Sequence, residues 1–176
     1  MQEIVLPSGV KAELDSLSSE IKITGKLGST KKKYNQRFSS VKIETGKIII
    51  EENKNKKLAS QSALLCKVLA NEINGAVKGV TNGMERHMKV VFAHFPVAIE
   101  VKPGVVLVKN IFGEKYSREA KIIGDTKVEV KGQDIFVKGV DVYDVGQTVA
   151  NLNKVSFERN KDSRVFQDGI YLVSEE

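Results

Sequence analysis

Residues 42–50 read KIETGKIII, and residues 127–136, which begin 85 positions later, read KVEVKGQDIF. In both stretches alternating apolar residues lead to a glycine and then to a second apolar run, a pattern typical of two strands joined by a tight turn. The second stretch has one extra residue before its glycine, so that Gly46 corresponds to Gly132. The two stretches predict that one structural unit occurs twice in the chain.

The same correspondence continues on both sides of these stretches. The further matched positions are Ile21 with Val106, Ile23 with Val108, Gly28 with Gly113 and, beyond the inserted residue, Gln61 with Gln147. Ordered self-similarity at one offset is the signature of a repeat. We therefore expect two domains, residues 1–79 and 80–153, followed by a tail at residues 154–176.

Each copy is expected to be an antiparallel sheet with one packed helix, which gives an α+β fold of two tandem duplicated domains. Alternating apolar residues predict strands at 20–24, 47–51, 88–92, 98–101, 105–108, 127–130 and 135–137. Apolar residues at helical spacing predict one buried helix face in each copy, made of Leu58, Leu65, Leu69, Ile73 and Ala76 in the first and of Val142, Val145, Val149 and Leu152 in the second. Asp141 is expected to cap the second helix.

The C-terminal tail continues neither the helical nor the strand period. It nevertheless contains Phe157, Phe166, Ile170 and Tyr171. Disordered tails rarely carry so many large apolar groups. We therefore expect an extended segment that is held against its own domain or a partner, and whose removal after Leu152 leaves both domains folded.

The formal net charge is +6, and it is distributed unevenly along the chain. Residues 1–80 contain 14 Lys and Arg against 8 Asp and Glu, whereas residues 81–176 contain 14 against 14. The densest basic run is expected in one loop region and consists of Lys26, Lys31, Lys32, Lys33 and Arg37. A basic balance favours a polyanionic partner, although a charge run of this kind is equally compatible with a solvated loop.

Composition excludes several protein classes. No stretch approaches the roughly 20 apolar residues that span a bilayer, and the N-terminus lacks the layout of a secretory signal. The single cysteine, Cys66, excludes a disulfide framework and fits a cytoplasmic location. It is expected to pack as a small apolar residue.

The residues that enzymes use are not grouped in this sequence. His87 and His94 are seven positions apart and have one distant cysteine, which does not make a metal site. His94 is expected to be a half-buried histidine whose ring is satisfied by its neighbours. No serine or cysteine has a partnered base nearby. We expect neither an enzyme nor a cofactor.

Several blocks in the second half resemble a known family. Residues 79–83 (GVTNG), Lys89, residues 93–96 (AHFP) and residues 110–116 (NIFGEKY) are similar in order and spacing to the family of the protein numbered six of the large ribosomal subunit. Residues 160–171 (NKDSRVFQDGIY) resemble its archaeal and eukaryotic branch, because the bacterial branch ends instead in a segment of the type PEPYKGKG.

The resemblance implies two tandem α+β domains and a structural role in the cytoplasmic ribosome. It implies binding to large-subunit rRNA, mostly by the second domain and the tail, near the sarcin–ricin and translation-factor-binding region. The expected partners are rRNA and neighbouring ribosomal proteins, with no membrane and no small-molecule substrate.

Two segments hold the candidate RNA-binding residues. The loop contributes Asn110, Gly113, Lys115, Tyr116 and Arg118, and the tail contributes Lys154, Arg159, Asn160, Lys161, Arg164, Gly169 and Tyr171. Basic side chains can neutralise phosphates, a glycine lets a backbone approach closely, and an aromatic ring can stack on a base. The plainer interpretation is an ordinary hairpin followed by a solvated basic tail.

Two other interpretations remain open on sequence grounds. A protein–protein scaffold would present the edge strands of its sheets to a partner, with charge serving solubility. A free-standing RNA-binding regulator would use the same basic and aromatic residues away from the ribosome. The tail favours nucleic acid over a scaffold, because a scaffold would carry an exposed apolar stripe.

Overall fold

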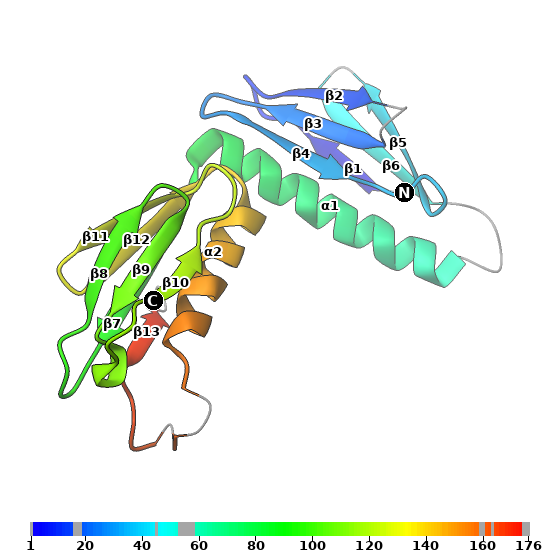
Figure 1. Cartoon of the computed structure of the whole chain (residues 1–176). Helices are drawn as coiled ribbons and strands as arrows, with labels where there is room; N and C mark the ends of the chain where they lie inside the picture. Colours follow the sequence, from blue (N-terminus) through cyan, green and yellow to red (C-terminus); the bar gives the residue numbers. More distant parts are fainter. Residues whose placement is uncertain are drawn as a thin grey trace. The chain divides into compact units, whose positions relative to one another are not determined.

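A computed structural model describes residues 2–15, 19–44, 46–52, 59–158, 161–162 and 164–173. It divides the chain into two compact units, Met1–Gly83 and Met84–Glu176. The fold is α+β: antiparallel sheets and two α-helices make up the described residues (Figure 1).

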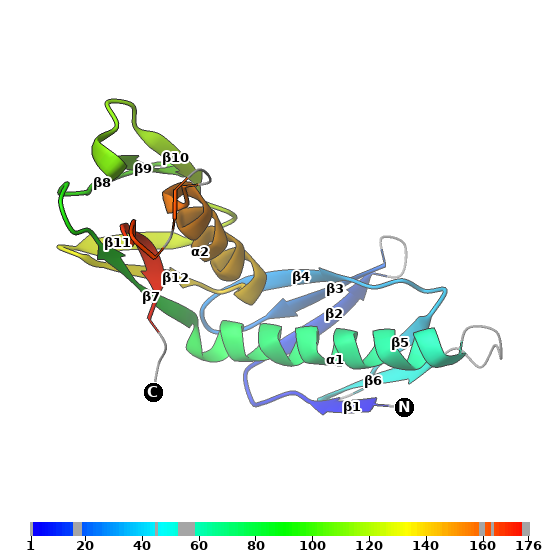
Figure 2. The same cartoon turned by 90° about the horizontal axis from the view of Figure 1, so that it is seen from below.

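The first unit contains two small sheets and one long helix. One sheet has the order β1-β6-β5, with β1 at Gln2–Val5, β6 at Lys47–Glu52 and β5 at Ser39–Glu44. The other has the order β2-β3-β4, with β2 at Lys11–Asp15, β3 at Glu20–Thr24 and β4 at Ser29–Lys33. Helix α1, Ala59–Asn82, packs against strands of both sheets (Figures 1 and 2). Isoleucines fill the space between them, and Ile21, Ile23, Ile48, Ile50 and Ile73 are fully buried.

The second unit repeats this plan and adds a strand. Its larger sheet has the order β11-β12-β7-β13, with β11 at Lys127–Lys131, β12 at Asp134–Gly139, β7 at Met84–Val91 and β13 at Gly169–Leu172. Its smaller sheet has the order β10-β9-β8, with β10 at Arg118–Lys121, β9 at Val105–Lys109 and β8 at Ala98–Lys102. Helix α2, Val142–Ser156, packs against strands of both (Figure 2). A short 3-10 turn, η1 (Ile111–Gly113), follows β9.

The two units have the same order of six strands and a helix, with the same strand neighbours. The match extends to register between the first and sixth strands of each unit. Gln2 pairs with Ile50 in β1 and β6, and the residues 85 and 86 positions further on, His87 and Phe136, pair in β7 and β12. The offset read from the sequence therefore aligns paired backbone positions.

Most of the expected strands are present at the expected positions. The two helices also form, and the Asp141 side chain caps α2 by accepting a hydrogen bond from the Tyr143 backbone N–H at 2.8 Å. For two residues the expected burial is wrong. Leu65 is 41% exposed and Val142 is 37% exposed, while Leu58 lies outside the described residues.

The buried face of α1 includes two small residues, Ser62 and Cys66, that were not among the five residues of the expected face. Ser62 and Cys66 are fully buried, and Leu69, Ile73 and Ala76 continue the face at spacings of three and four. Leu65 precedes Cys66 by one position, which turns its side chain by about 100° away from that face. Val142 is the first residue of α2 and lies at its exposed end.

The basic run of the first half also differs from the expectation of a loop. Ser29–Lys33 is strand β4, paired antiparallel with β3. Lys31 and Lys33 are exposed, and Lys33 forms an ion pair with Glu20 at 3.3 Å. Thr30 is buried and Lys32 is partly buried, so the segment alternates as a strand at the edge of a sheet. Lysines on an edge strand discourage pairing with other chains.

The expected domain boundaries also shift in the structure. Residues 79 and 80 lie inside α1, which runs to Asn82, and residues 154–156 belong to the last turn of α2. The tail then returns as β13, which pairs antiparallel with β7 and places Ile170 in the core of the second unit. This pairing argues against the expectation that the second unit stays folded without the tail, because removal of the tail would take a strand and a buried isoleucine from it.

Candidate nucleic-acid interface

The loop between β9 and β10 is folded tightly by left-handed backbone. Asn110, Phe112 and Gly113 have φ values of 60°, 51° and 78°. The Asn110 side-chain amide donates to the Pro96 carbonyl at 3.0 Å. A Cβ on Gly113 would lie 3.3 Å from the Phe95 ring. Asn110 and Gly113 thus shape the loop from within.

Lys115 and Tyr116 are the side chains that this loop presents to solvent. Both are exposed, and the Tyr116 ring is 87% exposed. Exposure of a whole tyrosine ring leaves a flat apolar surface in water, which suits stacking on a base or ribose. The loop can therefore offer one cation and one aromatic ring to a nucleic acid.

Arg118 follows the loop, and its guanidinium connects it to the end of α2. It donates to both carboxylate oxygens of Glu114, at 2.8 and 2.5 Å, and to Glu158 at 2.7 Å. It also donates to the backbone carbonyls of Val155 and Phe157 at 3.0 and 3.2 Å. Sequence reasoning assigned Arg118 to RNA, but its donors are occupied within the protein. The side chain fixes the loop relative to the start of the tail.

This arrangement shifts the pKa values of the paired groups apart. Hydrogen bonds from Arg118 hold the pKa of the Glu114 carboxyl below its ordinary value, although partial desolvation opposes the shift. Hydrogen bonding to Glu114 raises the pKa of Arg118 above its already high ordinary value. Both groups therefore stay ionised over the whole physiological range.

The tail packs onto the loop through aromatic rings. The Lys161 ammonium lies 4.8 Å from the centre of the Phe112 ring and 4.9 Å from that of Phe166. The two rings meet edge to face at 6.5 Å. Cation–π contacts of this length are attractive. They place Lys161 at a defined point although its side chain is exposed.

Polar contacts fix the last strand beside the end of α2. Asn153 donates its side-chain amide to the Ile170 carbonyl at 3.0 Å, and Ser156 Oγ accepts from the Ile170 N–H at 3.0 Å. Asp168 Oδ1 accepts from the Ala93 N–H at 2.8 Å, and the Tyr171 hydroxyl donates to the Gln167 carbonyl at 3.1 Å. These bonds anchor the segment on both sides.

Gly169 is required by close packing, and its predicted contact with RNA stays a prediction. It is buried, and a Cβ there would lie 3.1 Å from the Tyr171 ring. Sequence reasoning placed it in the RNA-binding set, but the structure gives it a packing role. Tyr171 itself is exposed by 45% and remains accessible.

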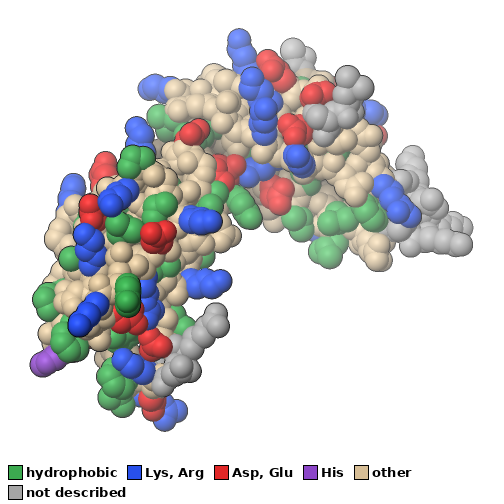
Figure 3. All heavy atoms as spheres, viewed as in Figure 1, with side chains coloured by type: hydrophobic (Ala, Val, Ile, Leu, Met, Phe, Trp, Pro, Cys, Tyr) green, Lys and Arg blue, Asp and Glu red, His purple; other side chains and the backbone are tan. Residues whose placement is uncertain are grey.

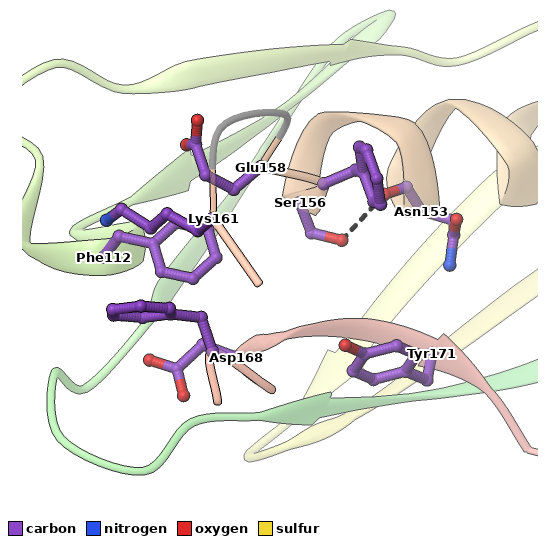
Figure 4. Close-up of a pocket in the computed structure, with 9 residues that line it drawn as sticks. Phe112, Asn153, Ser156, Glu158, Lys161, Asp168 and Tyr171 are labelled. Atoms are coloured by element: carbon purple, nitrogen blue, oxygen red, sulfur yellow. Dashed lines mark hydrogen bonds between the residues drawn. The ribbon is translucent and has the colours of Figure 1, made fainter. Parts of the chain in front are cut away.

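A hollow of about 140 Å³ opens where loop, helix end and tail meet. In Figure 4, Phe112 and Lys161 lie on one side of it and Tyr171 on the other. Phe157, Phe166, Glu158 and Asp168 also line it. The loop and the tail, which are about 40 residues apart in the sequence, thus form one continuous site.

Of the predicted site residues, the structure brings Lys161 and Tyr171 into this hollow and ties Arg118 to its wall. Lys154 and Arg164 are exposed, in the last turn of α2 and in the tail. Arg159 and Asn160 lie outside the described residues. Residues that the predicted set lacked are Phe112, Phe157, Phe166, Glu158 and Asp168. The interleaving of phenylalanines with basic residues was the sequence signal for some of them.

Charge on the second unit is mixed. Figure 3 shows Lys and Arg side chains alternating with Asp and Glu over its surface in this view. Lys138 forms ion pairs with Glu85 and Glu129 at 3.3 and 3.5 Å, which is typical of this alternation. A nucleic acid would therefore meet local groups rather than a single-sign field.

The described residues contain no group of His, Cys, Asp or Glu that could hold a metal ion. His87 stacks on Phe136 with ring centres 4.8 Å apart and contacts Asp134 at 2.9 Å. His94 is exposed and meets the edge of Phe95, so its expected half-burial is wrong because the turn after β7 faces solvent. Cys66 is buried, as expected.

Among the helices of the described chain, none is long and apolar enough to cross a membrane.

Comparison with known proteins gives a consistent result. The chain is 36% identical over 175 residues to the large ribosomal subunit protein uL6 of Methanobrevibacter smithii, covering 99% of this chain and 96% of the relative. It is 37% identical over 174 residues to uL6 of Picrophilus torridus, covering 99% and 94%. It is 39% identical over 178 residues to uL6 of Staphylothermus marinus, covering 97% and 92%. No family model matches the chain.

The chain belongs to the uL6 family of large ribosomal subunit proteins. The resemblance noted in the sequence is thereby confirmed, and it extends over nearly the whole chain. Its relatives are ribosomal proteins rather than enzymes, and they place it on the cytoplasmic ribosome.

Proposed function

We propose that this chain is a structural constituent of the large ribosomal subunit that binds rRNA through one end of its second unit. The site lies near the sarcin–ricin and translation-factor-binding region, and the protein supports translation from there. Its partners are the rRNA and neighbouring ribosomal proteins.

One observation carries the proposal. Two segments far apart in sequence converge at the end of the second unit and present exposed cations next to exposed aromatic rings. Lys115, Lys154, Lys161 and Arg164 are the exposed cations described there. Cations neutralise phosphates, and aromatic rings stack on unpaired bases. The combination fits RNA better than it fits the apolar surface of a scaffold partner.

The internal bonds of the site support a binding role without chemistry. Hydrogen bonds within the unit connect the loop, the tail and β13, and they are made by Arg118, Asp168 and Ser156. A site fixed before binding loses less conformational entropy when it meets its partner. We infer that the second unit binds its partner in the assembled particle as a preformed, rigid site.

We also propose that the two units are copies of one ancestral fold. The same strand order and the shared register of β1–β6 and β7–β12 support this proposal. Superposition of residues 2–82 on 84–156 is expected to bring Gly28 over Gly113 and Gln61 over Gln147. A superposition that separated these pairs would count against a common origin.

The experiment is co-sedimentation of the full chain with archaeal large subunits in high salt, paired with binding to an rRNA fragment that contains the sarcin–ricin region. A subunit constituent is expected to stay with the particle and to bind this fragment more tightly than a fragment of equal length from elsewhere. Release in high salt together with equal affinity for both fragments would instead support a free RNA-binding regulator.

A further inference from the structure

The hollow at the end of the second unit has more aromatic surface than phosphate binding needs. Phe157, Phe166 and Tyr171 line it and are exposed by 61%, 47% and 45%, and Phe112 forms a further side. Clustered exposed apolar groups mark interaction sites. Rings at a nucleic-acid interface stack on bases, since every base has a flat π-face.

Charged groups of both signs surround the hollow. Lys161 lines it, and Arg164 and Lys154 are exposed on the segments that lead into and out of it. Two carboxylates, Glu158 and Asp168, also line it. Carboxylates repel phosphate but accept hydrogen bonds from exocyclic amino groups of bases. The interior therefore suits the edge of a base, while the cations suit the backbone that carries it.

The walls are fixed before any ligand arrives. Asp168 accepts from the Ala93 N–H through one oxygen, and Tyr171 is held by its bond to the Gln167 carbonyl. Lys161 is held by the Phe112 and Phe166 rings. At about 140 Å³ the hollow is smaller than the roughly 300–1,000 Å³ of pockets that enclose larger ligands, which limits it to one ring system.

We propose that this hollow binds one unstacked RNA base that carries an exocyclic amino group: adenine, cytosine or guanine. The base stacks on the exposed rings, and its amino group donates to Asp168. The inference rests on the proposed rRNA binding and adds to it a base-specific subsite. An arginine side chain from a neighbouring protein would also meet rings and carboxylates, but Lys161 already places a cation there, which disfavours a second one.

The test uses the full chain and the rRNA fragment that contains the sarcin–ricin region. Phe157→Ala removes an exposed ring, and Val165→Ala removes a side chain that is 73% exposed in the same segment but does not line the hollow. We expect Phe157→Ala to weaken binding about 5- to 100-fold, the range for loss of one stacked base. The slope of log affinity against log salt should stay the same, because no phosphate contact is lost. Val165→Ala should bind as the unchanged protein does.

Asp168→Asn tests the edge of the base. The amide oxygen can still accept from Ala93, while an N–H donor replaces the second acceptor. Probing the unchanged protein's complex with dimethyl sulfate for adenine and cytosine, and with kethoxal for guanine, should reveal one protected base. That base should become reactive again with Phe157→Ala. Replacing that base with the analogue that has a carbonyl in place of the amino group (uracil for cytosine, hypoxanthine for adenine, xanthine for guanine) should weaken binding to the unchanged protein. It should restore part of the binding to Asp168→Asn.

Three outcomes would overturn the base subsite. The first is normal RNA binding by both Phe157→Ala and Asp168→Asn. The second is a salt slope that flattens with Phe157→Ala, and the third is a Gly-Arg-Gly peptide amide that shifts the Phe157 ring signals in NMR spectra while the RNA does not. Failure of the unchanged protein to bind the fragment would instead remove the proposed function itself.

Discussion

The two units of this chain share a scaffold and differ in what is attached to it. Strand β1 lies at the edge of its sheet in the first unit. Its equivalent, β7, has β13 on that side. The tail thus occupies the edge that the first unit leaves unpaired within its described sheet. The arrangement shared by the two units supplies the sheets, and the segment outside it supplies most of the candidate site.

Charge shows the same division. The whole excess of basic residues lies in residues 1–80, yet the candidate site lies in the half whose formal charges balance. In the first unit lysines line the edge strand β4, where they protect against aggregation. In the second unit Lys161 is held beside the rings of Phe112 and Phe166 by cation–π contacts. The candidate site is therefore defined by the placement of its cations and not by net charge.

The largest expected effect is on the stability of the second unit. Ile170→Ala should lower its free energy of unfolding by about 2–5 kcal/mol, because Ile170 is fully buried and the change leaves a cavity. Leu172→Ala, in the same strand but half exposed, is the control and should cost far less. Hydrogen exchange measured separately for the two units checks this. Equal losses for both variants would contradict the assignment of β13 to the core.

Truncation after Ser156 extends this test. It removes β13 and the bonds from Asn153 and Ser156, so the second unit should lose most of its protection from exchange while the first unit keeps its own. Retention of a folded second unit would show that the tail is an accessory to a complete domain.

The next effect concerns the connection made by Arg118. Arg118→Ala removes the hydrogen bonds from the guanidinium to Glu114 and Glu158 and leaves the carbonyls of Val155 and Phe157 without this donor, which should cost about 1–3 kcal/mol. RNA affinity should fall because loop and tail separate, with no change in salt slope. Arg118→Lys, which keeps the charge but cannot make five bonds, should behave almost like alanine.

The ion pair of Arg118 with Glu114 predicts that stability depends on pH. The folded-state pKa of Glu114 is lowered, so its stabilising contribution is complete above its ordinary pKa and is lost as the pH falls through the lower folded value. Acid titration of the unchanged protein should therefore show a loss of stability that is smaller in Arg118→Ala. Identical acid profiles would show that the contact contributes nothing.

Much of this fold was predictable from the sequence because the repeat doubles each signal. The strand at 20–24 and the cap at Asp141 follow from alternation and capping alone. The buried face of α1 was misjudged because Ser62 and Cys66, which are small, occupy core positions that hydropathy assigns to leucine. Strand β13 was missed because four residues are too few to show a period, and its pairing with β7 is a long-range contact.

The residue types of the candidate site could be predicted from the sequence, but the contacts that each residue makes could not. Exposed lysines and Tyr116 were found from residue type alone. For Arg118 and Gly169 the sequence could not show that the guanidinium has carboxylate partners or that the glycine lies under a tyrosine ring. Asp168 was missed because an acidic residue in a basic tail looks like charge balance.

A smaller expected effect, on the salt dependence of RNA binding, distinguishes cations that contact phosphate from cations that only face solvent. Arg164→Ala and Lys161→Ala should each reduce the salt slope of binding by about one. Lys31→Ala, on the exposed side of β4, is the matched control and should leave the slope unchanged. A larger change for Lys31→Ala would move the interface to the first unit.

The most direct test of the central claim compares equivalent tethers on the two units. Ser29→Cys and Ser117→Cys introduce exposed thiols in β4 and in the loop before β10. Cys66→Ala removes the buried native thiol from both proteins. Iron–EDTA attached to each thiol then cleaves nearby rRNA in reconstituted large subunits. The account predicts cleavage in the sarcin–ricin region from position 117 and none there from position 29. Cleavage of that region from position 29 alone would contradict it.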